Sequence, residues 1–158
     1  MTQQIDNAAI RRTLTAPTSV ERAFEQFTYG MASWWPPEYT WAGDVLETIG
    51  MEPQMNGRCF ERGPHNFTCD WGRVVAWEPP YRVAFTWQIS PNRQPEPDPV
   101  KASDVEVRFI VEGASTTRVE FEHRNFQRHG EGALEYFRAL DSSRGWTYIL
   151  DSYMEAVA

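Results

Sequence analysis

The last third of the chain, residues 126–158, carries two helical patterns of apolar residues. One helix is predicted over residues 131–140, where Leu134, Phe137 and Leu140 recur at three-residue spacing. A second is predicted over residues 145–157, with Ser142 or Ser143 as the candidate N-cap. Its wide apolar stripe consists of Trp146, Ile149, Leu150, Tyr153, Met154 and Val157. Such a stripe must be buried, so we expect this helix to cover one face of a sheet.

A shorter helical pattern lies near the start of the chain, over residues 19–28. Thr18 and Glu21 have the spacing of a capping box, and Gly30 follows the last apolar position. The apolar positions at helical spacing are Val20, Ala23, Phe24 and Phe27. Before this helix, alternating side chains predict a first strand over residues 8–15.

Alternation of apolar and polar residues predicts six further strands, over residues 44–49, 57–62, 69–78, 81–88, 103–112 and 117–124. In the last of these, Val119, Phe121 and His123 share one face, and charged side chains occupy the other. The two strands before it place Val105, Val107, Phe109 and Val111, and Tyr81, Val83, Phe85 and Trp87, on one face. The sequence therefore predicts an α+β fold, with an antiparallel sheet that has an apolar face and a charged face.

Two segments interrupt this pattern. Residues 31–41 are rich in aromatic side chains, and Pro36 and Pro37 exclude a regular helix or a central strand there. We expect this segment to fold over one end of the core as a lid, and we favour this interpretation over direct contact with a ligand. Residues 89–101 hold four prolines and predict an exposed, mobile, partly polyproline-like excursion.

Composition limits the class of protein. A chain of 158 residues with 41% hydrophobic residues predicts one domain, residues 1–158. The net charge of −7 argues against binding to nucleic acid or to an anionic membrane surface. Residues 1–6 show no signal sequence, no run could span a bilayer, and two cysteines make no disulfide framework, so we expect a cytoplasmic protein.

Candidate chemistry is sparse. Cys59, His65 and Cys69 lack a fourth ligand and regular spacing, so no metal site is predicted. No nucleophile elbow, phosphate loop or dinucleotide motif occurs, so no catalytic residue or cofactor is predicted. His123 faces the core or a cavity and is either a satisfied core histidine, the favoured interpretation, or a polar contact for a ligand. Arg58 is the candidate partner for a ligand carboxylate.

The two cysteines flank a predicted hairpin turn over residues 63–66. Cys59 and Cys69 are nearly equally distant from its centre, which predicts that they lie opposite one another on adjacent strands. In a reducing compartment we expect both to be free thiols.

Five motifs in order carry a family resemblance: AFEQFT, WWPPEY, GRVVAWEPPYRVAFTW, VEFEHRNFQRHGEGA and GWTYIL. With them the chain resembles bacterial members of the family of activators of heat-shock-protein-90 ATPase homologues, in the START-like (SRPBCC) superfamily. The resemblance implies a helix-grip fold, in which a curved antiparallel sheet wraps around a long C-terminal helix with a cavity between them. Relatives in the superfamily bind lipids, sterols or polyketides, and some are cyclases or aromatases.

We therefore expect a protein that binds a small, mostly apolar or amphipathic molecule between sheet and helix. A cyclase or aromatase using the same cavity, and a chaperone-interaction module, are the alternatives, and a homodimer stays open. We expect an enclosed cavity lined by Trp87, Phe121, His123 and Trp146, with His123 as its main polar group. The predicted ligand-binding residues are Trp34, Trp35, Arg58, Phe85, Trp87, Phe109, Phe121, His123, Trp146 and Leu150.

Overall fold

The computed structural model describes residues 8–158; the predicted lack of a signal sequence in residues 1–6 falls outside them. Seven antiparallel strands form one sheet in the order β1-β7-β6-β5-β4-β3-β2. The strands are β1 (Ala9–Ala16), β2 (Thr48–Met51), β3 (Arg58–Arg62), β4 (Thr68–Glu78), β5 (Arg82–Trp87), β6 (Ser103–Gly113) and β7 (Thr116–Arg124). The helices are α1 (Val20–Thr28), α2 (Met31–Trp34), α3 (Ala133–Asp141) and α4 (Trp146–Val157), with short 3-10 turns between elements.

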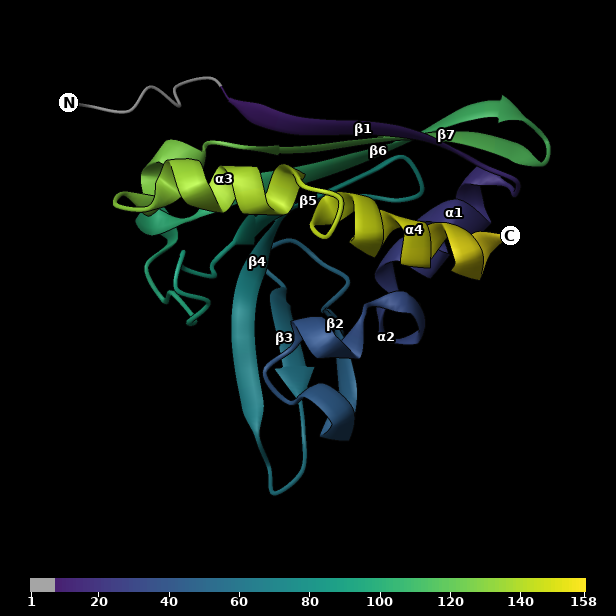
Figure 1. The fold of residues 1–158 in the computed structure, drawn as a ribbon. Helices are drawn as coiled ribbons and strands as arrows, with labels where there is room; N and C mark the ends of the chain where they lie inside the picture. Colours follow the sequence, from purple (N-terminus) through teal and green to yellow (C-terminus); the bar gives the residue numbers. More distant parts are fainter. Residues whose placement is uncertain (1–7) are drawn as a thin grey trace.

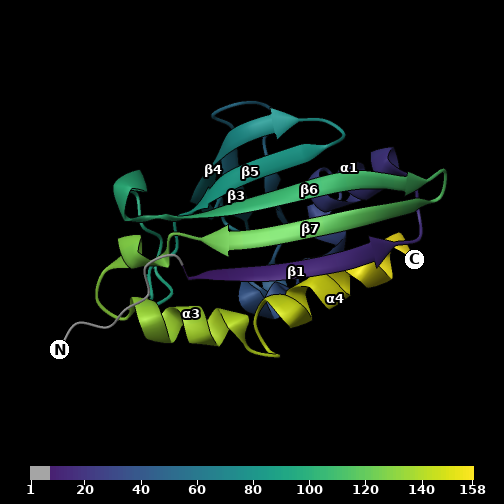
Figure 2. The same cartoon turned by 90° about the horizontal axis from the view of Figure 1, so that it is seen from above.

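The sheet curls into a half-barrel, and the helices lie on its concave side (Figures 1 and 2). The long strands β1, β7 and β6 run beside α3 and α4, whereas β4, β3 and β2 bend away below them (Figure 1). This is the α+β helix-grip arrangement that the sequence predicted. Within residues 8–158, no helix has the length and apolar character needed to cross a bilayer.

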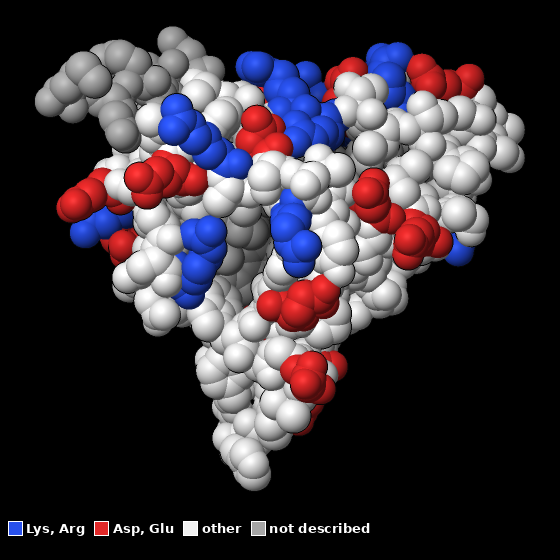
Figure 3. Space-filling view, in the orientation of Figure 1, with Lys and Arg blue, Asp and Glu red and all other residues white. Residues whose placement is uncertain are grey.

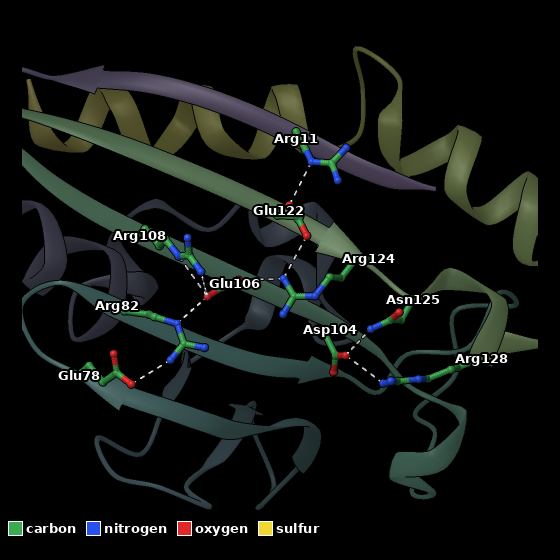
Figure 4. A network of polar contacts seen from close by, with 10 residues as sticks. All are labelled: Arg11, Glu78, Arg82, Asp104, Glu106, Arg108, Glu122, Arg124, Asn125 and Arg128. Carbon is green, nitrogen blue, oxygen red and sulfur yellow. Dashed lines mark hydrogen bonds and ion pairs between the residues drawn. The ribbon is translucent and has the colours of Figure 1, made fainter. Parts of the chain in front are cut away.

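The predicted inward faces of the last two strands are confirmed except at Val111, which is 56% exposed where a bulge interrupts the end of β6. Phe121 and His123 on β7 and Val107 and Phe109 on β6 point inward and are at most 2% exposed. The opposite face is a ladder of ion pairs centred on Glu106, which accepts from Arg82, Arg108 and Arg124 (Figure 4). One strand start differs, because Tyr81 precedes β5 and is 58% exposed instead of facing the core.

Several local predictions need correction. Ser19, one residue after the predicted Thr18, caps α1 by accepting the N–H of Arg22 at 3.3 Å. Residues 43–45 form a 3-10 turn, so β2 starts at Thr48 instead of near residue 44. The 31–41 segment contains one short α-helix, α2, which ends before the two prolines, and a 3-10 turn over Pro37–Tyr39.

The cysteines do not lie opposite one another. Cys69 pairs with Glu61, and Cys59 pairs with Gly72. The β3–β4 turn is longer than predicted because His65 and Asn66 both adopt positive φ, and a bulge at Cys59 and Phe60 shifts the register further. The predicted pairing was therefore wrong, and each thiol is free in a different environment.

The predicted serine cap of α4 is not formed. Instead, α4 begins where the backbone of Gly145 packs closely against the end of α3. Gly145 occupies the N-cap position, where no side chain makes a capping hydrogen bond. A Cβ at this position would collide with the carbonyl oxygen of Leu140, so only glycine lets the chain turn from α3 into α4 this tightly. The turn brings the two helices together along the same side of the sheet (Figure 2).

Candidate ligand-binding cleft

A cleft of about 530 Å³ opens between the α3–α4 turn, the end of β5 and the aromatic segment after α2. Figure 3 shows a hollow on this face, with Lys or Arg side chains on both sides of it. The volume lies within the usual range for small-molecule sites. The lining residues are Trp35, Glu38, Tyr39, Thr40, Trp41, Trp87, Ile89, Arg93, Tyr136, Ala139, Leu140, Ser142, Arg144, Gly145 and Ile149.

One wall of the cleft comes from residues 37–43, which are fixed at their backbone by a buried carboxylate. Glu61 on β3 is 1% exposed and accepts the N–H groups of Trp41 at 3.1 Å and Ala42 at 2.9 Å. These two bonds satisfy a carboxylate that would otherwise be costly to bury. Glu61 therefore positions the loop that presents Tyr39, Thr40 and Trp41 to the cleft.

The same segment is tied to both sides of the cleft. The indole Nε1–H of Trp41 donates to the carbonyl oxygen of Arg93 at 2.9 Å. The hydroxyl of Tyr39 donates to the carbonyl oxygen of Arg144 at 2.7 Å. Tyr39 and Trp41 thus tie the 37–43 segment to the α3–α4 turn at Arg144 and to the loop after β5 at Arg93.

The floor is an aromatic network centred on Tyr136. Its hydroxyl accepts from Trp87 Nε1–H at 2.7 Å and donates to the carbonyl oxygen of Ile89 at 2.9 Å. Burial raises the pKa of Tyr136 to about 12, so the phenol stays protonated and its hydrogen bonds stay fixed at neutral pH. The guanidinium of Arg93 lies over the Tyr136 ring at 4.6 Å from its centroid.

The structure separates the ten predicted ligand-binding residues into three groups. Trp35 and Trp87 line the cleft. Arg58 lies far along the sheet in a second, polar hollow and pairs with Glu52 at 3.1 Å. The other seven lie in the packed core behind the cleft and are at most 3% exposed: Trp34, Phe85, Phe109, Phe121, His123, Trp146 and Leu150.

The expected enclosed cavity lined by Trp87, Phe121, His123 and Trp146 differs from this geometry because aromatic rings fill that space. The ring centroids of Phe121 and Trp146 are 4.4 Å apart, and those of Trp87 and Trp146 are 5.3 Å apart. Of the four residues, only Trp87 reaches the cleft. The cleft lies one layer further out, between these rings and the 37–43 segment.

His123 is a satisfied core histidine. Its Nδ1 accepts from Trp146 Nε1–H at 2.9 Å, so its Nε2 carries the proton and donates to Ser103 Oγ at 2.6 Å. Ser103 then donates to Nε2 of His129 at 2.7 Å. Desolvation lowers the pKa of His123 well below its usual value, and the pKa of His129 to about 4. No polar group of His123 is left to bind a ligand.

Comparison with known proteins places the chain in a family. Residues 17–158 match the family described as "Activator of Hsp90 ATPase homolog 1-like protein". The chain belongs to this family. No curated protein matches it.

Solved structures extend the likeness of this family member. It is 34% identical to an anthrahydroquino-γ-pyrone synthase, Txn09, complexed with SUM; the match covers 98% of this chain and 100% of that one, with a TM-score of 0.68. CalC, a self-sacrificing resistance protein from Micromonospora echinospora, is 22% identical, with 96% and 94% covered and a TM-score of 0.65. A protein from Nitrosomonas europaea is 13% identical, with 93% and 92% covered and a TM-score of 0.63. The last two show the fold alone.

Sequence reasoning missed most of the cleft in this family member. On α3 it chose the stripe of Leu134, Phe137 and Leu140, which is only partly buried, whereas Ala133 and Tyr136 are fully buried. It predicted residues 89–101 as an exposed excursion, and most of them are exposed, but it did not predict that Ile89 and Arg93 line the cleft. The helical stripes did include Leu140 and Ile149, which line the cleft. Tyr136, three residues after Ala133 and four before Leu140, carried a similar helical signal that was not used.

Proposed function

We propose that this protein binds a flat aromatic molecule in the cleft beside α3 and α4. The observation that supports the proposal is the composition of its walls: five aromatic side chains line one hollow, namely Trp35, Tyr39, Trp41, Trp87 and Tyr136. Rigid aromatic surfaces stack on planar ligands with little loss of side-chain entropy. The fold of this family is a ligand-binding fold, which agrees with the proposal.

The cleft also offers polar contacts that would orient such a ligand. The hydroxyls of Thr40 and Ser142 already donate to the carbonyl oxygens of Pro37 and Ala139, so toward a ligand each can only accept. Glu38 is the only carboxylate among the lining residues. The hydroxyl of Tyr148 donates to Glu38 and lowers the pKa of its carboxyl group, so Glu38 is ionised at neutral pH. A mostly apolar hollow with a few fixed polar groups is typical of small-molecule sites.

Filling the cleft tests the proposal. Ala139 is exposed on α3 and lines the cleft, so Ala139→Trp should occupy the space of the ligand. Arg138→Trp places the same side chain on the neighbouring exposed position outside the lining and is the matched control. Calorimetric titration with anthraquinone-2-carboxylate and with its neutral carboxamide should show binding to the native protein and to the control.

We expect the Ala139→Trp variant to lose at least about tenfold in affinity, equivalent to about 1.4 kcal/mol. Its far-ultraviolet circular dichroism and melting temperature should match those of the control. Equal affinities of the two variants for a probe would place the binding site elsewhere, and no binding to the native protein would contradict the proposal.

A second candidate function is ring closure on the bound aromatic molecule. It is favoured by the 34% identity, over nearly the whole chain, to a protein described as a γ-pyrone synthase. A 2-hydroxyaryl 1,3-diketone closes to a γ-pyrone when its phenolic oxygen bonds to the distal carbonyl carbon and one water leaves. Glu38, the only carboxylate among the lining residues, would accept the phenolic proton. Mass spectrometry should show this loss of water faster with the native protein than with the Glu38→Gln or Ala139→Trp variant; equal rates would rule out catalysis of this reaction in the cleft.

A further inference from the structure

The charged side chains that line the cleft indicate the charge of the ligand. The whole chain carries a net charge of −7, yet two arginines and one glutamate line the cleft. Among residues 8–158, eight other arginines have a carboxylate partner within 4.0 Å, namely Arg11, Arg12, Arg58, Arg82, Arg108, Arg118, Arg124 and Arg128. Neither Arg93 nor Arg144 has such a partner among the described residues. Four arginines outside the cleft lining, Arg22, Arg62, Arg73 and Arg138, also have none within residues 8–158.

Arg93 is held in place by its backbone and its side chain. Its φ of +65° is in the left-handed region, which a long side chain rarely adopts. Hydrogen bonds hold the turn in this shape, from Arg93 N–H to Ser90 O at 2.8 Å and from Ser90 N–H to Gln94 O at 2.8 Å. Backbone strain of this kind is concentrated at functional sites.

The side chain of Arg93 is also held in place, and most of its N–H groups have no partner among the described residues. Its guanidinium stacks on Tyr136, and one nitrogen donates to Pro91 O at 2.6 Å. A guanidinium has five N–H groups, so most remain free to contact an acceptor. Because Arg93 lines the cleft and stacks on its floor, these free N–H groups are available to an acceptor bound there.

Arg144 supplies positive charge from the other side. It lies in the α3–α4 turn, where its carbonyl oxygen accepts from Tyr39 while Trp41 binds the carbonyl oxygen of Arg93. Both arginines are therefore fastened at their backbones to the same 37–43 segment. The backbone positions from which the two guanidinium groups extend are therefore held on opposite sides of the cleft.

We propose that the cleft selects aromatic ligands that carry an acidic group, a carboxylate or an ionised phenol, which lies between Arg93 and Arg144. This inference rests on the proposed function and adds the charge of the ligand. The aromatic walls hold the ring system, and the two guanidinium groups fix its orientation by binding the acidic edge.

The test compares two probes of the same shape, anthraquinone-2-carboxylate and anthraquinone-2-carboxamide, by calorimetric titration at low salt. The native protein should bind the carboxylate about fivefold more tightly than the carboxamide, as expected for partly exposed charge contacts. In Arg93→Gln and Arg144→Gln this ratio should fall toward one, and Arg93→Lys should retain part of it. High salt should also reduce the ratio.

Arg138→Gln removes the same charge from an exposed position on α3 outside the lining, so its ratio should equal that of the native protein. An equal loss in Arg138→Gln would mean that net charge and not contact sets the preference, which overturns the inference. Equal affinity of the native protein for both probes would also overturn it and leave the proposed function standing. Failure of the native protein to bind either probe would contradict both.

Discussion

At the scale of single residues, the histidine chain in the core decides how the fold responds to acid. His123 and His129 flank Ser103, and Nδ1 of His129 is buried without a partner among the described residues. Both histidines are neutral in the folded protein because burial disfavours the charged form. Protonation of either ring would break a hydrogen-bond pattern in which each nitrogen of His123 already has a role.

The pH dependence of stability follows from this. In the folded state the pKa of His129 is about 4, below its ordinary value of 6.5, so the unfolded chain binds protons more readily. The contribution of neutral His129 to the stability of the fold is complete above pH 6.5, and it is lost as the pH falls from 6.5 toward 4. We expect His129 alone to lower the free energy of unfolding by roughly 2–3 kcal/mol across this range. His123, whose pKa is also lowered, adds to this loss.

Urea unfolding at a series of pH values measures the drop. His129→Asn removes one titrating group and should flatten the profile between pH 6.5 and 4. His65→Asn is the control, because His65 is exposed and asparagine tolerates its positive φ. A native profile that stays level down to pH 4 would contradict the assignment of two neutral core histidines.

At the scale of elements, alternation and helical period predicted what touches the core, because these patterns report burial directly. The inward faces of β6 and β7 and the stripe of α4 needed no knowledge of partners. The cleft could not be predicted this way. Its shape depends on long-range ties, such as Glu61 to the backbone of Trp41, and Tyr39 to Arg144, that leave no periodic signal. The predicted pocket residues were therefore largely those of the core layer next to the cleft.

The contact between α4 and the sheet leads to a prediction about stability. Trp146 is fully buried, contacts the rings of Phe121 and Trp87, and donates to His123. Trp146→Ala should lower the free energy of unfolding by about 3–5 kcal/mol, as for other buried large aromatics. Chemical denaturation measures this loss, with the exposed Tyr148→Ala on the same helix as the control. An unchanged midpoint for Trp146→Ala would mean that α4 does not cover the sheet.

At the scale of the whole molecule, the curled sheet and the α3–α4 pair form a rigid frame, and the 37–43 segment completes a cleft against it (Figure 1). The outer face of the sheet is occupied by its own ion pairs (Figure 4). The concave side is therefore where the fold offers an aromatic surface to a small molecule. The cleft is therefore the feature that supports the proposed binding of a ligand. The chaperone partner and the homodimer stay predictions.

Mapping the seven tryptophan indole N–H signals by ¹⁵N nuclear magnetic resonance tests the central claim most directly. Trp35, Trp41 and Trp87 line the cleft, and Trp77 lies outside it. Titration with anthraquinone-2-carboxylate should shift the signals of the first three, with smaller changes at Trp71 and Trp146, whose rings pack against them. The signal of Trp77 should stay in place. Saturation with no shift at Trp35, Trp41 and Trp87, or with the largest shift at Trp77, would contradict the assignment of the cleft as the binding site.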